Sequence, residues 1–142
     1  MDDIGGNLLS KSEDISFHHI GWATGSIEKE REYLLRLGYA QEGEEFSDAT
    51  QGIRGCFLNG LGPRIELLEN LSGSDTLTPW LDAGVKMYHM AYLTESLEET
   101  LTWIRSHRAK VIVEPVPAVA FGGRRISFVM LPNRFLVEFI ET

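Results

Sequence analysis

Histidine and glutamate recur at matched positions in the two halves of the chain, inside runs with the apolar pattern of strands. Four runs share this property: 17–22, 64–69, 87–92 and 134–141. Within them, His89 follows His19 by 70 residues and Glu138 follows Glu66 by 72. Alternate residues of a strand share a face, and Glu138 shares its face with apolar residues. Because a buried carboxylate needs a cation, a proton or hydrogen-bond donors, each half must satisfy its polar pair inside the fold.

The first half has the pattern strand, helix, strand, strand, strand. The expected strands are 17–24, 39–47, 51–58 and 64–69. A helix after the first strand would begin at the N-cap Ser26 and end at Gly38. Residues 70–86 form a polar connector with a short helical piece at 79–81.

The second half repeats this order. The expected strands are 87–93, 110–113, 125–130 and 134–141. Thr94 or Ser96 would cap a helix whose apolar stripe begins at Leu97. Pro115 and Pro117 are expected to end the strand that begins at residue 110.

The duplication predicts an α+β fold built from two βαβββ modules, residues 15–70 and 86–142, within a single domain. One helix cannot cover both faces of a four-stranded sheet, so two curved sheets placed edge to edge would form a half-open cup. His19, Glu66, His89 and Glu138 would meet in its floor, two from each module. Residues 1–14 are expected to form a flexible tail.

Two imidazoles and two carboxylates suit a divalent ion such as Zn, Co, Ni, Mn or Fe(II). Neutral histidines and ionised glutamates cancel its charge and leave positions open to substrate, as in catalytic sites. A single His in a strand is more often a core residue and a single Glu more often faces solvent, but the shared register of all four favours the metal. Without metal, repulsion is expected to leave a proton on Glu66 or Glu138.

Neighbouring polar residues have simpler explanations. His18 alternates with His19 and is expected to be exposed. Glu69 and Glu141 end their strands and are expected in solvent, whereas Cys56 has the apolar neighbours of a core thiol.

The net charge of −8 over 142 residues argues against nucleic acids and anionic membranes as partners. The single cysteine excludes an intrachain disulfide and favours a reducing compartment. The acidic N-terminus lacks the apolar core of a signal peptide, so we expect a cytoplasmic protein.

The chain resembles the vicinal oxygen chelate superfamily of glyoxalase I, methylmalonyl-CoA epimerase, extradiol dioxygenases and bleomycin resistance proteins. The resemblance covers residues 17–141 and is carried by the four runs above, with methylmalonyl-CoA epimerase the nearest fit. It implies that His19, Glu66, His89 and Glu138 are the metal ligands, with one Co, Zn, Ni or Mn ion per chain, and that the protein is a homodimer.

The chain departs from the epimerase pattern at two positions near the expected site. Tyr88 stands where epimerases usually have a second histidine before the ligand. Gly55 stands where some epimerases carry a glutamate proposed as an acid or base. The fold and the metal do not depend on these positions, whereas the substrate and the base do.

The resemblance implies an enzyme that transfers a proton alpha to a carbonyl of a small-molecule substrate: an isomerase, an epimerase or a lyase. Glu138 and Glu66 are the candidate catalytic carboxylates. The substrate would be a chelating carbonyl compound, such as the acyl-CoA thioester methylmalonyl-CoA. The alternatives are an extradiol dioxygenase, with His19, His89 and Glu138 on Fe(II), and a metal-free resistance protein that binds a drug.

Overall fold

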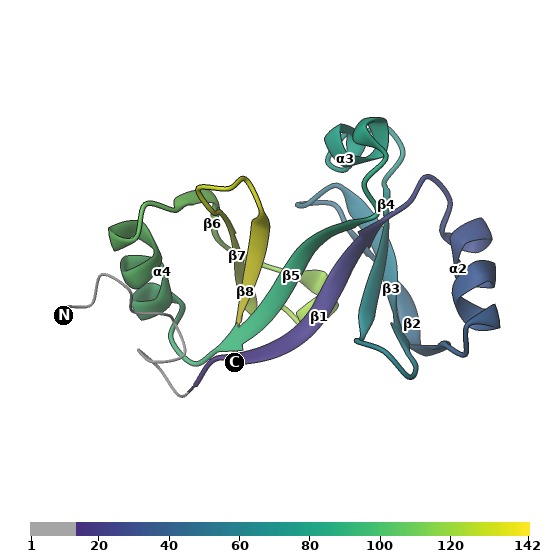
Figure 1. The fold of residues 1–142 in the computed structure, drawn as a ribbon, viewed down its shortest axis with the longest axis horizontal. Coiled ribbons are helices and arrows are strands. Elements are labelled where there is room, and N and C mark those ends of the chain that lie inside the picture. Colours follow the sequence, from purple (N-terminus) through teal and green to yellow (C-terminus); the bar gives the residue numbers. More distant parts are fainter. Residues whose placement is uncertain (1–13) are drawn as a thin grey trace.

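A computed structural model describes residues 14–142 and has an eight-stranded curved sheet with helices outside it (Figure 1). The elements of the first half are β1 (Ser16–Ala23), α2 (Ile27–Arg36), β2 (Ala40–Asp48), β3 (Ile53–Asn59) and β4 (Ile65–Asn70). Those that follow are α3 (Thr78–Ala83), β5 (Met87–Thr94), α4 (Leu97–Ser106), β6 (Lys110–Pro117), the 3₁₀ helix η2 (Val119–Phe121), β7 (Arg125–Met130) and β8 (Leu136–Glu141). The predicted α+β fold is confirmed.

The strand order β2-β3-β4-β1-β5-β8-β7-β6 is symmetric about its centre. In each half the first strand runs parallel to the last, as β1 with β4 and β5 with β8. The two halves join through the antiparallel pair β1 and β5, which cross the middle of Figure 1 between α2 and α4. This is the edge-to-edge union of two modules that the sequence predicts. The single-domain assignment stays a prediction. Residues 1–13 of the expected tail lie outside the part of the chain that the structure describes.

Each long helix begins at a serine cap and packs an apolar stripe on the sheet. The Ser26 hydroxyl accepts a hydrogen bond from the amide of Lys29, and the Ser96 hydroxyl accepts one from Glu99. Ser96 is therefore the cap of α4, and Thr94 bonds a neighbouring threonine instead. The buried stripe of α4 consists of Leu97, Leu101 and Ile104.

Glu69 and Glu141 do not simply face solvent, so that expectation is wrong. A carboxylate oxygen of Glu69 accepts a hydrogen bond from the backbone amide of Ile27 at 2.8 Å. A carboxylate oxygen of Glu141 accepts one from the amide of Leu97 at 3.3 Å. Both amides open a helix, where the backbone has unpaired N–H groups. The last glutamate of each module thus ties its closing strand to its own helix.

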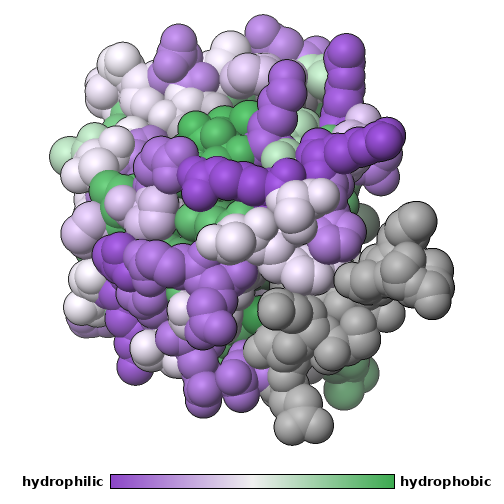
Figure 2. All heavy atoms as spheres, turned by 90° about the vertical axis from the view of Figure 1, so that its left-hand side faces the viewer, coloured by the Kyte–Doolittle hydropathy of each residue, from purple (hydrophilic) through white to green (hydrophobic). Residues whose placement is uncertain are grey.

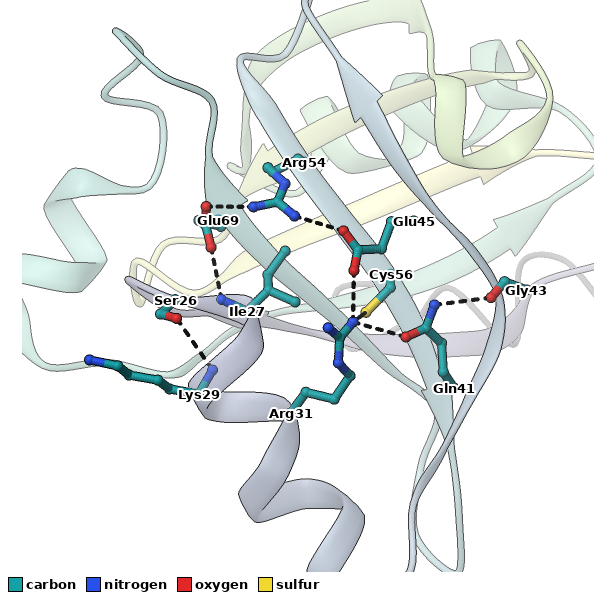
Figure 3. Close-up of polar contacts among 10 residues, drawn as sticks. All are labelled: Ser26, Ile27, Lys29, Arg31, Gln41, Gly43, Glu45, Arg54, Cys56 and Glu69. Atoms are coloured by element: carbon teal, nitrogen blue, oxygen red, sulfur yellow. Dashed lines mark hydrogen bonds and ion pairs between the residues drawn. The ribbon is translucent and has the colours of Figure 1, made fainter.

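Ion pairs extend this connection over the outer face of the first module (Figure 3). Arg54 donates to Glu69 at 2.9 Å and to Glu45 at 2.7 Å. Arg31 of α2 donates to the same Glu45 at 2.8 Å and to Gln41 at 2.9 Å. The network joins α2 to three strands.

Cys56, next to Arg31 of this network, is fully buried as predicted, and burial raises the pKa of its thiol.

Asp48 connects the two halves at the cavity end of β2. It is 2% exposed, and its carboxylate accepts hydrogen bonds from the amide and side chain of Gln51. It also accepts one from the backbone amide of Val119, in the 3₁₀ helix of the second half, at 3.0 Å. Burial opposes ionisation, but these hydrogen bonds outweigh it and lower the pKa of Asp48.

Strand β6 continues through Pro115 to Pro117, so the predicted end near residue 113 is wrong. The strand lies at the sheet edge, where proline need not donate to a second neighbour. Its pairing with β7 shifts register twice, between Val111 and Val113 and again before Val116. These irregularities let an edge strand accommodate both prolines.

None of the described helices is long and apolar enough to cross a membrane. Figure 2 shows that polar side chains dominate the face seen there, with hydrophobic side chains showing between them.

Candidate metal centre

The four predicted residues converge because the central strands align them. Gly21 of β1 pairs with Glu66 on one side and with His89 on the other. Ala91 of β5 pairs in the same way with Glu138 of β8 on one side and with His19 of β1 on the other. Each histidine therefore lies opposite a small residue, and the glutamate of the other module lies on the far side of that residue.

The donor atoms form a compact buried cluster. His19 Nε2 lies 3.1 Å from Glu66 Oε1, 3.3 Å from Glu138 Oε1 and 3.2 Å from His89 Nε2. His89 Nε2 lies 3.1 Å from Glu138 Oε1 and 3.8 Å from Glu66 Oε1. No side chain of the four is more than 5% exposed. Both modules thus contribute equally to one site.

This donor set fits a divalent metal ion. All four donor atoms lie within 4.8 Å of one another. Ligands about 2.1 Å from an ion are separated by roughly 3.0 Å at right angles and roughly 3.4 Å at tetrahedral angles. The 3.1–3.3 Å separations around His19 match that range. Glu138 Oε1 is also buried without a well-directed hydrogen bond, which leaves a lone pair for an ion.

The charges favour a cation at the centre of the cluster. Burial opposes protonation of His19, but the nearby carboxylates of Glu66 and Glu138 outweigh it and raise the pKa of His19. Burial disfavours the Glu138 anion, but the close imidazoles of His19 and His89 outweigh it and lower the pKa of Glu138. These two shifts favour a proton on the His19 imidazole over one on Glu138 when no metal is bound. The expectation of a protonated carboxylate is therefore not met at Glu138.

His18 supports this centre, which corrects its assignment as an exposed residue. Its Nδ1 lies 2.8 Å from Nδ1 of His19, on the side of the His19 ring away from the cluster. Burial, together with His19, lowers the pKa of His18 to about 4, so it is neutral at pH 7. Phe121 stacks on the His19 ring, with centroids 5.9 Å apart and planes at 18°. The ring of His19 is thus held on two sides.

His89 occupies space that only glycine leaves open. A Cβ atom at Gly21 would overlap the imidazole of His89. The sequence signal is a small residue two positions after each histidine, Gly21 after His19 and Ala91 after His89. That signal is visible only once the two strands are known to pair.

A cavity of about 420 Å³ opens beside the cluster, and both Glu66 and Glu138 line it. Tyr88 also lines it, and its hydroxyl makes no hydrogen bond within residues 14–142. Burial, followed by the charges of the two glutamates, raises the pKa of Tyr88 well above its usual value. The hydroxyl is therefore a protonated donor at the cavity wall.

Gly55 leaves no room for a side chain, and so no third carboxylate projects from that position. A Cβ atom there would lie 2.6 Å from the Leu68 side chain and 2.7 Å from the carbonyl oxygen of Leu67. Phe46 closes the remaining side. The carboxylates that line the cavity are therefore Glu66 and Glu138.

A family model for the Glyoxalase/Bleomycin resistance protein/Dioxygenase superfamily matches residues 18–128. The chain belongs to this superfamily. A comparison with curated proteins gave no match.

Solved structures agree with membership of the superfamily. A hypothetical protein from Bacillus halodurans C-125 is 28% identical, with a TM-score of 0.75 and coverage of 90% of this chain and 94% of that one. Methylmalonyl-CoA epimerase from Mycobacterium tuberculosis is 23% identical, with a TM-score of 0.72 and coverage of 88% and 86%. A Streptomyces coelicolor methylmalonyl-CoA epimerase in complex with 2-nitronate-propionyl-CoA is 23% identical, with a TM-score of 0.70 and coverage of 89% and 94%. At 23% identity, the likeness to the epimerases concerns the fold.

Proposed function

We propose that the protein is a metal-dependent isomerase or epimerase that transfers a proton alpha to a carbonyl group. One observation carries this proposal. Two buried histidines and two buried glutamates form a single cluster, and the two glutamates alone open onto a cavity large enough for a small molecule.

His19, Glu66, His89 and Glu138 would hold one divalent ion, with Co, Zn, Ni and Mn as candidates. When bound, the ion would act as a Lewis acid that polarises the carbonyl of the substrate. His18 would keep the His19 ring oriented through their 2.8 Å contact.

The chain's own acid–base groups are the two glutamates. A carboxylate oxygen of Glu138 would accept the alpha proton and later release it to solvent. For epimerisation, Glu66 would first take up a proton from solvent and then deliver it to the opposite face. Their separate strands, β8 and β4, lie on either side of the central pair β1 and β5, which suits a two-faced transfer. A lyase or a simple isomerase would need only one of them.

The structural likeness to methylmalonyl-CoA epimerases makes a 2-substituted acyl-CoA thioester the first substrate class to test. We also expect a homodimer in the cytoplasm, as the sequence predicts.

Two other functions can be distinguished from an isomerase by experiment. An extradiol dioxygenase would bind Fe(II) through His19, His89 and Glu138, and it would consume oxygen. The 3.1 Å contact of Glu66 with His19 favours a four-residue ligand set instead. A metal-free resistance protein would bind its drug without using the four clustered donors. Metal analysis of the purified protein distinguishes it from a metal-dependent enzyme.

The proposal is tested by hydrogen exchange. Metal-loaded protein and methylmalonyl-CoA are incubated in D2O, and deuterium at the alpha carbon is followed by NMR. Glutamine cannot accept the proton, so Glu138→Gln should slow exchange by roughly 10²- to 10⁴-fold. Glu44→Gln, at an exposed position of β2, is the matched control and should exchange normally.

Full metal content with near-normal exchange in Glu138→Gln would contradict the role of Glu138. Oxygen consumption in place of exchange would contradict the reaction class.

A further inference from the structure

The walls of the cavity beside the metal centre are apolar. They come from both halves and include Ile53, Trp80, Ile112, Val116, Phe128 and Met130. The lining also includes the uncharged polar residues Thr50, Gln51 and Thr76, of which Gln51 and Thr76 contact each other. The Gln51 side chain already donates to Asp48, and Thr76 donates to the Gln51 carbonyl. Apart from Glu66 and Glu138, a ligand in the cavity therefore meets mostly hydrocarbon.

No Lys or Arg lines the cavity among residues 14–142. The ionisable groups that do line it are Glu66, Glu138 and Tyr88, and none of them can neutralise an anion. A second carboxylate or a phosphate inside the cavity would lose its hydration without gaining a counter-ion. That loss is costly for a charged group.

We infer that the substrate carries a bulky, uncharged, apolar group, aromatic or branched, next to the oxygens that chelate the metal. This inference rests on the proposed function and specifies its substrate class. It implies that a charged chain such as that of coenzyme A must lie outside the cavity.

Size and wall chemistry support this group. Ligand sites typically span about 300–1,000 Å³, and a methyl substituent would leave most of the 420 Å³ cavity unfilled. The rings of Trp80 and Tyr88 lie 4.9 Å apart, centroid to centroid, and Phe128 lines the cavity as well. Aromatic walls of this kind pack well against a ring or a branched aliphatic chain.

Three hydroxamates test the inference, because each chelates a metal through two vicinal oxygens. Acetohydroxamate, benzohydroxamate and 4-carboxybenzohydroxamate are titrated into Co(II)-loaded protein, and the visible spectrum of the cobalt is followed. Each affinity is corrected for the probe's affinity for free Co(II). Burial of the phenyl ring should make benzohydroxamate bind roughly tenfold to a hundredfold more tightly than acetohydroxamate. The added carboxylate should remove most of that gain.

A charge introduced at the cavity rim tests the same point without disturbing the core. Ile112 lines the cavity and is 53% exposed, so Ile112→Lys should fold normally. It should tighten 4-carboxybenzohydroxamate by about tenfold and leave acetohydroxamate unchanged. Leu61→Lys is the matched control, because Leu61 is fully exposed and does not line the cavity.

The outcomes separate the inference from the proposed function. Equal corrected affinities for the three probes would overturn the apolar substrate class while leaving a chelating metal centre. Tighter binding of the carboxylated probe than of benzohydroxamate in the unmodified protein would overturn it as well. If Co(II) is held but none of the three probes binds, the chelation step fails, and the proposed function fails with it.

Discussion

At the scale of single residues, the centre depends on the lack of a side chain at Gly21 as much as on the four donor residues. His89 can turn its Nε2 toward the cluster because Gly21, opposite it on β1, has no side chain. His89 Nδ1 is buried and has no hydrogen-bond partner among the described residues. Packing against Gly21, rather than a hydrogen bond to Nδ1, therefore sets the direction of this ring.

Gly21→Ala should displace the His89 ring, because the new methyl group would occupy its place. We expect a loss of Co(II) affinity of roughly 10- to 100-fold, as for other changes that disturb the orientation of a ligand. Isothermal titration with Co(II) measures the loss, and circular dichroism checks the fold. Gly25→Ala is the control, since a Cβ atom there meets nothing within 4 Å. Equal affinity in the two variants would contradict this role for Gly21.

The four donors could be predicted from the sequence, because strand periodicity and the repeat place them in register. The groups that hold the donors could not. Strand alternation places the His18 side chain on the outer face, yet its ring nitrogen contacts His19. Phe121 stacks on His19 from the other half of the chain. Both contacts depend on how the strand twists and on which distant segments meet, and single-sequence patterns do not contain that information.

At the scale of elements, the sequence predicts the strands and helices well and their polar connections poorly. The caps Ser26 and Ser96 follow from local patterns. The bonds from Glu69 and Glu141 to helix amides depend on the tertiary packing of each helix on its strand. The continuation of β6 through Pro115 depends likewise on its position at the sheet edge.

The bond between Asp48 and Val119 gives a pH-dependent connection between β2 and the 3₁₀ helix. A carboxyl group with a lowered pKa in the folded state stabilises the fold above its unfolded pKa of about 3.9. This stabilisation is lost as the pH falls through the folded pKa. Asp48→Asn replaces one acceptor by an N–H donor that would face the backbone amide of Val119 or of Gln51. It should lower the free energy of unfolding by about 1–3 kcal/mol at pH 7.

Urea denaturation between pH 7 and pH 3 measures this effect. The difference between the unmodified protein and Asp48→Asn should be largest at pH 7 and should shrink below about pH 4. Asp82→Asn, at an exposed position of α3, serves as the control and should change little at any pH. A difference that is constant with pH would contradict the assignment to ionised Asp48.

At the scale of the whole molecule, a bound ion would connect strands from both modules. An ion that binds only the folded chain stabilises it by mass action, by about 2.7 kcal/mol at a hundredfold excess over Kd. For a chain of this size, that corresponds to a rise in Tm on the order of 5 to 10 °C.

Differential scanning calorimetry with and without Co, Zn, Ni or Mn measures the rise. His89→Ala should abolish it, because the variant lacks one ligand of the second module. His107→Ala is the control, since His107 stacks on Trp103 at the end of α4 and not in the cluster. An unchanged Tm with all four ions would contradict metal binding.

The equal division of the centre between the halves has a consequence for how such a site arises. Each half brings one histidine and one glutamate, related by the symmetry of the strand order about β1 and β5. An ancestral peptide of one half would hold only two donors, and a pair of identical copies around a twofold axis would complete the set. Fusion of the two genes would then free each half to diverge. Such a history would let one wall of the cavity change while the candidate metal centre keeps its symmetry.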